Sequence, residues 1–183
     1  MKVNLPLTKN GIQGFAIGDV LELTGHLLTA RDAAHKRFGE AVKRGEELPI
    51  DLTDAVVFYA GPCPTRPGRI IGPIAPTTSL RMDPYVEMMM QKGMIATIGK
   101  GDRAAYIAPL LKKYQGLYLV GIGGTSALIS KSVKSVEEIA YPDLKTESIK
   151  RLYVEDMKVM VAIDAEGRVL HWEEREKYRI AEA

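Results

Sequence analysis

The feature that most constrains the fold is a succession of short apolar runs, each followed by a loop rich in glycine or proline and then by a helical pattern. These runs span 55–59, 94–98 and 117–122. At five or six residues they are too short for core helices, and their β-branched and aromatic side chains are typical of buried strands. Buried strands that alternate with helices predict a mixed α/β fold.

The stretches between these runs carry helix and turn signals. Gly45 is expected to end a helix that precedes it, and the three consecutive methionines at 88–90 favour core packing over a cofactor site. The elements expected are a strand at 20–24, a helix at 31–44 capped by the Thr29 hydroxyl, a helix at 84–92 with Asp83 as N-cap, a helix at 102–114 that Pro109 kinks, a short helix at 126–129, and a hairpin of 157–163 with 168–172.

Length and composition favour one ordinary domain over residues 1–183. The chain is 46% hydrophobic and 26% charged, and it lacks both an apolar run of about 18 residues and the apolar stretch of a secretory signal. We therefore expect a cytoplasmic protein that does not enter a membrane. A net charge of only +2, spread along the chain, argues against a nucleic-acid partner.

Cysteine usage excludes several kinds of site. Cys63 is the single cysteine, so the chain can form no internal disulfide and cannot hold an iron-sulfur cluster by itself. The three histidines show no spacing typical of zinc ligands. We expect no metal bound by this chain alone.

Four loops carry cations, hydroxyls or glycines where predicted strands end or helices begin, positions at which backbone amides can bind an anion. They span 29–32, 76–81, 99–101 and 123–126. Arg31 and Arg81 can each grip a carboxylate with two parallel donors, which suits a dicarboxylate ligand. The plainer alternative is that Arg31 pairs with Asp32 and Arg81 with Asp83.

Other candidates in these loops are less specific. Lys100, between two glycines, offers a free point charge but is equally an ordinary turn lysine. Thr77 and Thr78 supply hydroxyls among cations, and His35 lies one helical turn after Arg31, where packing or a supporting role is favoured. The glycines of 121–124 resemble a dinucleotide fingerprint only weakly, because Ser126 replaces its third glycine.

Taken in order, the motifs resemble those of the beta subunit of class I fumarases and L-tartrate dehydratases. The resemblance covers nearly the whole chain, and its two arginine-bearing motifs are the most specific. The segments that carry it are 18–25 (GDVLELTG), 29–36 (TARDAAHK), 59–62 (YAGP), 76–83 (PTTSLRMD), 98–101 (IGKG), 123–124 (GG) and 154–156 (VED).

The resemblance implies a swivelling β/β/α domain of mixed sheets with flanking helices. It also implies a cysteine-bearing alpha subunit that holds a 4Fe-4S cluster with one iron open to substrate. The beta side is expected to bind substrate carboxylates, matching Arg31, Arg81 and Lys100, and to handle the C3 proton, matching Thr77. Asp32, Thr78 and His35 would support those residues.

The implied reaction is the reversible hydration of fumarate to L-malate, carried out by a hetero-oligomer, for which the family suggests two copies of each subunit, or by a dimer. Left open are the dehydration of tartrate and a stand-alone module that binds a dicarboxylate or another anion. Two residues depart from the family pattern, since Ala30 and Ala75 stand where glycines are usual. A glycine with positive φ at either place would require a different local backbone here.

Overall fold

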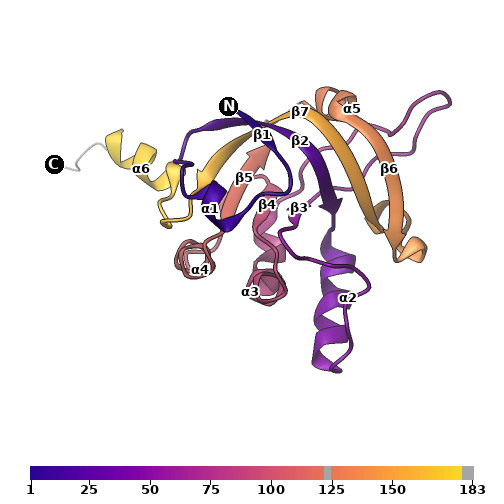
Figure 1. The fold of residues 1–183 in the computed structure, drawn as a ribbon, viewed down its shortest axis with the longest axis horizontal. Coiled ribbons are helices and arrows are strands. Elements are labelled where there is room, and N and C mark those ends of the chain that lie inside the picture. Colours follow the sequence, from indigo (N-terminus) through magenta and orange to yellow (C-terminus); the bar gives the residue numbers. More distant parts are fainter. Residues whose placement is uncertain (122–124, 179–183) are drawn as a thin grey trace.

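The computed structural model describes residues 1–121 and 125–178, and over these ranges it is a mixed α/β fold with one seven-stranded sheet and flanking helices, as predicted (Figure 1). The strand order is β1-β2-β3-β4-β5-β7-β6, with a further pairing between β2 and β7. The strands are β1 (Lys2–Asn4), β2 (Val20–Thr29), β3 (Val56–Phe58), β4 (Ala96–Gly99), β5 (Leu117–Gly121), β6 (Val133–Ala140) and β7 (Ile149–Ile163).

The helical elements fill the connections between these strands. In the described part of the chain no helix is long and apolar enough to cross a membrane. The helices are α1 (Lys9–Ile12), α2 (Asp32–Lys43), α3 (Asp83–Gln91), α4 (Ile107–Tyr114), α5 (Ser126–Ser132) and α6 (Leu170–Lys177), with 3₁₀ turns η1 (Ser79–Met82) and η2 (Pro142–Glu147).

The pairings of five strands close into a ring. β2, β3, β4 and β5 are parallel neighbours, and β7 pairs antiparallel with both β5 and β2. β1 lies beside β2, and β6 lies beside the first half of β7. The ring therefore brings the carboxyl ends of four parallel strands to one edge of the molecule.

Alternation along the strands separates two apolar cores. Val56 and Phe58 belong to a cluster that draws on all five ring strands, whereas Val57 belongs to a second cluster shared with the helices. On β5, Leu119 faces the first cluster and Tyr118 the second. Because side chains of a strand point alternately to its two faces, the first cluster fills the ring and the second lies outside it.

Helices α2, α3 and α4 cover the outer cluster and stand side by side on one face of the sheet (Figure 1). Phe38, Met89 and Leu111 anchor the three helices and are fully buried. Burial of a side chain of this size contributes roughly 1.5–3 kcal/mol. Met90 is also buried, which confirms that the methionines of α3 serve as core.

The N-caps predicted for the helices 31–44 and 84–92 were wrong, although both helices begin within one residue of the predicted start. Thr29 ends β2, and its hydroxyl accepts a hydrogen bond from Lys150 N at 3.1 Å instead of capping a helix. The N-cap of α2 is Arg31, which gives no side-chain cap. Asp83 lies inside α3, directly after η1, and its carboxylate accepts from Arg103 and from the backbone of Ala104.

Two further predictions need correction. The predicted helix 102–114 begins only at Ile107, so Pro109 lies in its first turn, where its missing N–H leaves no bond unmade. The predicted hairpin is replaced by the long strand β7 and by α6. A single bridge between Ile163 and Val169 is all that remains of the second strand, because Asp164 closes a tight turn through Arg168.

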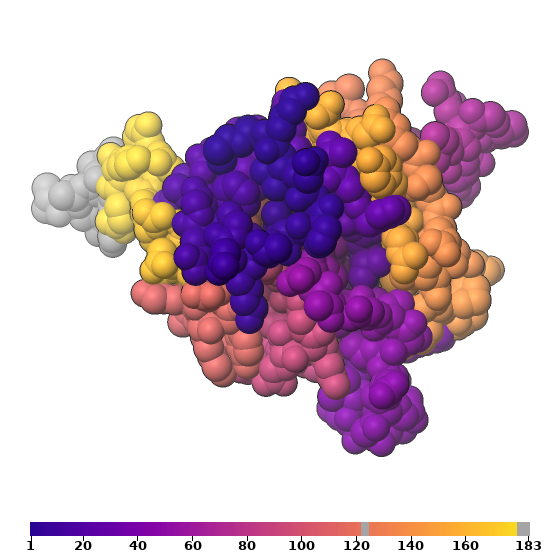
Figure 2. All heavy atoms as spheres, viewed as in Figure 1, coloured from indigo at the N-terminus to yellow at the C-terminus, as the bar shows by residue number. Residues whose placement is uncertain are grey.

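An exposed arm projects from the body between β3 and the predicted loop 76–81. All residues from 63 to 70, called the arm here, are exposed, and Figures 1 and 2 show this segment standing clear of the sheet. Its base is closed by the hydrogen bond from Cys63 N to Pro73 O at 2.9 Å. The arm carries Arg66 and Arg69 but no acidic residue, and Ile70 is 55% exposed.

Candidate functional site

Three of the four predicted loops meet at the carboxyl ends of β2, β3 and β4, where ligands bind in open α/β sheets. Backbone pairing connects the loop 76–81 to the end of β3 and to the Lys100 loop. Thr77 N donates to Tyr59 O at 2.7 Å, and Thr78 forms a parallel bridge with Lys100. Of the fourth predicted loop, residues 123 and 124 lie outside the described ranges, as does the end of the predicted strand 117–122.

Ser79 fixes the Lys100 loop to the sheet. Its backbone N donates to Lys100 O, and its hydroxyl accepts from Lys100 N, both at 3.1 Å. The same hydroxyl contacts Tyr118 Oη at 3.0 Å. A Cβ on Gly99 would lie 1.8 Å from the Ser79 hydroxyl, so only glycine fits between them.

Tyr118 completes this small polar core beneath Lys100. Its hydroxyl donates to Gly101 O at 2.8 Å. Burial raises the pKa of Tyr118 to about 12, so the phenol remains protonated and keeps this hydrogen bond at physiological pH. The main chain on both sides of Lys100 is therefore held in place.

Arg81 joins its own loop, 76–81, to the loop 29–32. Its Nε donates to Asp32 Oδ1 at 2.7 Å and its Nη2 to Asp32 Oδ2 at 3.2 Å, while the same Nη2 donates to Thr77 Oγ1 at 2.5 Å. The alternative that Arg81 pairs with Asp83 was wrong, since Asp83 is buried in another ion pair. Arg81 itself remains 48% exposed.

The charges in this cluster hold Asp32 ionised. Partial burial acts to raise the pKa of Asp32, but hydrogen bonds from Arg81 and the charges of Arg81 and Arg31 outweigh it and place the pKa below its ordinary value. Hydrogen bonding to Asp32 raises the pKa of Arg81 in turn. Asp32 therefore acts as an anchor for cations and is a poor proton donor near neutral pH.

Arg31 lies between two carboxylates and a glycine. Its Nη2 is 3.8 Å from Asp32 Oδ2, as the pairing alternative proposed, and 3.5 Å from Glu147 Oε1. A Cβ on Gly61 would come within 3.2 Å of Arg31 Cδ. Arg31 Nε is buried and has no hydrogen-bond partner, which leaves the guanidinium with donor capacity.

His35 lies behind Arg31 and is fully buried. Its Nδ1 is 2.8 Å from the Arg31 carbonyl oxygen, so this nitrogen carries the proton, and its Nε2 is buried without a partner. The ring packs against Tyr59, Phe38 and Tyr85. Burial lowers the pKa of His35 to about 4, so its contacts are those of a neutral packing residue.

Lys100 and Thr78 are exposed, as Arg81 is. Within residues 1–121 and 125–178, neither the Lys100 ammonium nor the Thr78 hydroxyl has a hydrogen bond or ion pair to another side chain. Lys100 is thus the cation of this group that stays unneutralised. Neither Ala30 nor Ala75 has a positive φ, so the two departures from the glycine pattern introduce no strain.

Sequence reasoning missed two structural supports of the site. Glu147 comes from η2, far along the chain, and no local pattern marks it. Arg103 and Asp83 form a fully buried ion pair, with Arg103 Nε to Asp83 Oδ1 at 2.5 Å and Arg103 Nη1 to Thr97 Oγ1 at 3.2 Å. This pair ties the segment after Lys100 to the start of α3.

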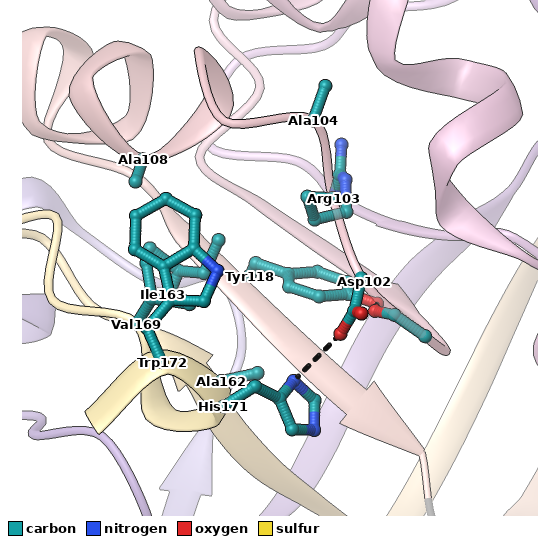
Figure 3. A pocket seen from close by; sticks show the side chains of 11 residues that line it. Asp102, Arg103, Ala104, Ala108, Tyr118, Ala162, Ile163, Val169, His171 and Trp172 are labelled. Carbon is teal, nitrogen blue, oxygen red and sulfur yellow. Dashed lines mark hydrogen bonds and ion pairs between the residues drawn. The ribbon is translucent and has the colours of Figure 1, made fainter. Parts of the chain in front are cut away.

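A small hollow lies beside the Lys100 loop but does not include the predicted site residues. It is lined by residues 101–104, α4, β5, β7 and α6, with His171 Nδ1 3.5 Å from Asp102 Oδ1 on one side and Trp172 beside Ala108 on the other (Figure 3). Small and apolar side chains line much of its wall. We interpret it as the place where α6 rests on the body.

The side chains of this chain offer few ligands for an iron-sulfur cluster. Such clusters require several cysteine thiolates. Cys63 is exposed at the base of the arm, and among the described residues no three His, Cys, Asp or Glu side chains gather as a metal site. The residues present therefore do not fit a cluster held by this chain.

Comparison with known proteins gives consistent matches. A family model described as "Fumarase C-terminus" matches residues 1–174. The chain is 33% identical to "Fumarate hydratase 2" of Leishmania major, covering 93% of this chain and 30% of that protein. For "Fumarate hydratase class I, aerobic" of Escherichia coli K12 the identity is 36%, covering 84% and 28% respectively.

A relative of similar length is "Putative L(+)-tartrate dehydratase subunit beta" of Methanocaldococcus jannaschii. It is 32% identical to this chain, and the match covers 93% of this chain and 91% of the relative. The chain thus spans less than a third of the fumarate hydratases but nearly all of this subunit.

Proposed function

Because this chain belongs to the fumarase C-terminus family, we propose that it is the beta-type part of a hydro-lyase that hydrates fumarate to L-malate. In this proposal the chain supplies carboxylate-binding and proton-transfer groups to a site completed by a second polypeptide. The observation that carries the proposal is the convergence of Arg31, Arg81, Lys100 and Thr77 on one edge of the sheet.

The charge balance favours a site shared with a partner. Asp32 and Glu147 neutralise Arg31 and Arg81, so the five groups together carry one net positive charge, that of Lys100. A dicarboxylate carries two negative charges and needs further positive charge to bind in a water-poor site. We infer that the remaining charge comes from the partner.

Thr77 is proposed as the group that exchanges the C3 proton. Its hydroxyl oxygen accepts a hydrogen bond from Arg81. A cationic donor stabilises the alkoxide more than the alcohol, which moves the hydroxyl toward the basicity that proton abstraction requires. Lys100 and Arg31 would meanwhile stabilise charge that builds on the substrate carboxylate as the proton leaves.

The partner is proposed to be a cysteine-bearing alpha-type subunit that holds a 4Fe-4S cluster. Support comes from the lengths of the relatives: the fumarate hydratases have more than twice as much chain beyond the part matched here. The arm leaves and re-enters the body next to the site, so a partner that covers the site would contact it. A swivelling movement of the domain against that partner would open and close the site.

The test is anaerobic reconstitution. The chain alone is expected to be inactive, and mixing it with the cysteine-rich product of a neighbouring gene is expected to give fumarate hydration, followed by the loss of fumarate absorbance. A complex that forms and carries its cluster but hydrates neither fumarate nor a related dicarboxylate would overturn the proposal. Calorimetry on the chain alone distinguishes this proposal from a stand-alone module, because such a module would bind a dicarboxylate tightly without a partner.

Tartrate is the second candidate substrate, since the relative of matching length is named as a tartrate dehydratase subunit. Both substrates present two carboxylates to the same cations, and they differ in the hydroxyl at the reacting carbons. Comparing kcat/KM for malate and L-tartrate in the reconstituted complex decides between them.

A further inference from the structure

Helix α2 begins in an unusual way, because its N-cap residue cannot cap it. The first backbone N–H groups of a helix lack partners within the helix, and Ser, Thr, Asp or Asn normally accepts from one of them. Arg31 occupies the N-cap, and its guanidinium has no acceptor atom. The cap has to come from elsewhere.

It comes from Glu147, 114 residues away in the sequence. Glu147 Oε2 accepts from Ala33 N, in the first turn of α2, at 2.9 Å. The second oxygen of the same carboxylate, Oε1, lies 3.5 Å from Arg31 Nη2. One side chain therefore both caps the helix and contacts the guanidinium of its N-cap residue.

Glu147 lies within a turn that is closed by hydrogen bonds between residues on both sides of it. The Lys145 carbonyl accepts from Ser148 N, Ser148 Oγ and Lys150 Nζ, at 3.1, 2.7 and 2.9 Å. Asp143, at the other end of η2, binds Arg37 on α2 through both of its oxygens. η2 is thus attached to α2 at two points.

On its other side the Arg31 side chain packs closely against Gly61. A Cβ on Gly61 would lie 2.7 Å from the Thr146 carbonyl oxygen and 3.2 Å from Arg31 Cδ. The Arg31 side chain therefore runs through a narrow space between Gly61 and the end of η2. The Glu147 carboxylate lies beside the guanidinium at the end of this space.

We propose that Glu147 is a positioning residue that supplies the missing cap of α2 and holds Arg31 in the direction needed to bind a substrate carboxylate. The capping half stands on geometry alone, whereas the binding half rests on the proposed function. The arrangement explains how an arginine can occupy an N-cap: the capping acceptor is moved to η2, and the N-cap position is left to a cation.

Two substitutions of Glu147 separate its capping role from its role in holding Arg31. Glu147→Gln keeps a carbonyl oxygen that can accept from Ala33 N but removes the charge that attracts Arg31, whereas Glu147→Ala removes both. Asp143→Asn is the matched control, since it weakens the other attachment of η2 to α2 and touches neither Ala33 nor Arg31.

The first readout uses the chain alone. Amide exchange of Ala33, measured by NMR, is expected to accelerate about tenfold in Glu147→Ala and little in Glu147→Gln or Asp143→Asn. The Arg31 Nε–H signal is expected to shift in both Glu147 variants and not in the control. Unchanged Ala33 exchange in Glu147→Ala, or an unmoved Arg31 signal in both variants, would overturn the proposal.

The second readout uses the reconstituted complex. Both Glu147 variants are expected to raise KM for the dicarboxylate about tenfold and to change kcat less, because the substrate cation is misdirected while Thr77 is untouched. A KM equal to that of the wild type would overturn the binding half. If the wild-type complex shows no activity, the proposed function fails, while the two NMR signals still decide whether Glu147 caps α2 and holds Arg31.

Discussion

The buried, neutral His35 makes the stability of this protein depend on pH in a predictable window. As the pH falls, the unfolded chain takes up a proton at the ordinary histidine pKa of 6.5, whereas the folded protein resists until about 4. The unfolded state therefore binds more protons between these values, and the free energy of unfolding falls as the pH falls. Above pH 6.5 the ring is neutral in both the folded and the unfolded state, so the free energy of unfolding is not reduced by this group.

The magnitude follows from the two pKa values. Each unit of difference is worth 1.36 kcal/mol, so the shift corresponds to roughly 3 kcal/mol in the limit of low pH and to about 2 kcal/mol already near pH 5. The physical origin is the buried Nε2, which would carry a hydrogen without an acceptor once the ring is protonated. This is a large share of the stability of an ordinary domain.

The assay is urea unfolding at a series of pH values in the wild type and in His35→Asn. The asparagine amide can still donate to the Arg31 carbonyl, as Nδ1 does, but it does not titrate. The variant is expected to be less stable near neutral pH because the ring contacts are lost. On acidification to about pH 5 its free energy of unfolding is expected to fall by about 2 kcal/mol less than that of the wild type. Equal losses in the two proteins would refute the reasoning.

Three further predictions concern the site and its surroundings. Arg81→Lys is expected to lower kcat/KM of the reconstituted enzyme by roughly one to three orders of magnitude, since lysine cannot hold Asp32 and Thr77 together; Arg44→Lys, which breaks a comparable exposed pair, is the control and should leave the kinetics as they are. Arg103→Met is expected to cost about 3–5 kcal/mol in urea unfolding, because it leaves a buried carboxylate without its partner; a loss below 1 kcal/mol would contradict this. Replacing both arginines of the arm by glutamate is expected to weaken binding of the proposed alpha-type partner at least tenfold in calorimetry while leaving the thermal melting temperature unchanged; unaltered affinity would remove the arm from the proposed interface.

The sequence was most informative where the physical signal is local. The apolar runs at 55–59, 94–98 and 117–122 predicted β3, β4 and β5, because strands buried on both faces need continuous apolar residues. The site loops followed directly, since loops after parallel strands meet at one edge whatever the details of packing. Their grouping could therefore be predicted without knowing any contact.

The second half of the chain was poorly predicted for a corresponding reason. β6 reads VKSVEEIA and is largely exposed, so neither an apolar run nor a strict alternation marks it. Its place is set by pairing with β7, which is a tertiary contact. The predicted cap at Thr29 was wrong because the strand β2 continues through a register shift at Gly25 to residue 29.

Ion-pair partners were the least predictable feature of the site. Arg81 has Asp83 two residues away, yet it binds Asp32, 49 residues earlier, while Asp83 binds Arg103. Helix η1 turns the two neighbours to different sides, one toward solvent and one into the core. Proximity in sequence is therefore weak evidence for a salt bridge once a helical turn separates two side chains.

The solvent exposure of Arg81 bears on the proposed partner. A salt bridge in contact with water contributes about 1 kcal/mol or less, so an Arg81 that is 48% exposed cannot hold a substrate carboxylate firmly in the chain alone. Catalysis by such groups needs water to be excluded, because the same charges interact far more strongly in a medium of low polarity. Among the described residues Arg81 and Lys100 are both exposed, and the arm, which begins shortly after Gly61 beside Arg31, is exposed over its whole length. The proposed second polypeptide would supply the cover that excludes water, so the solvent exposure of Arg81 supports that proposal as much as the single cysteine does.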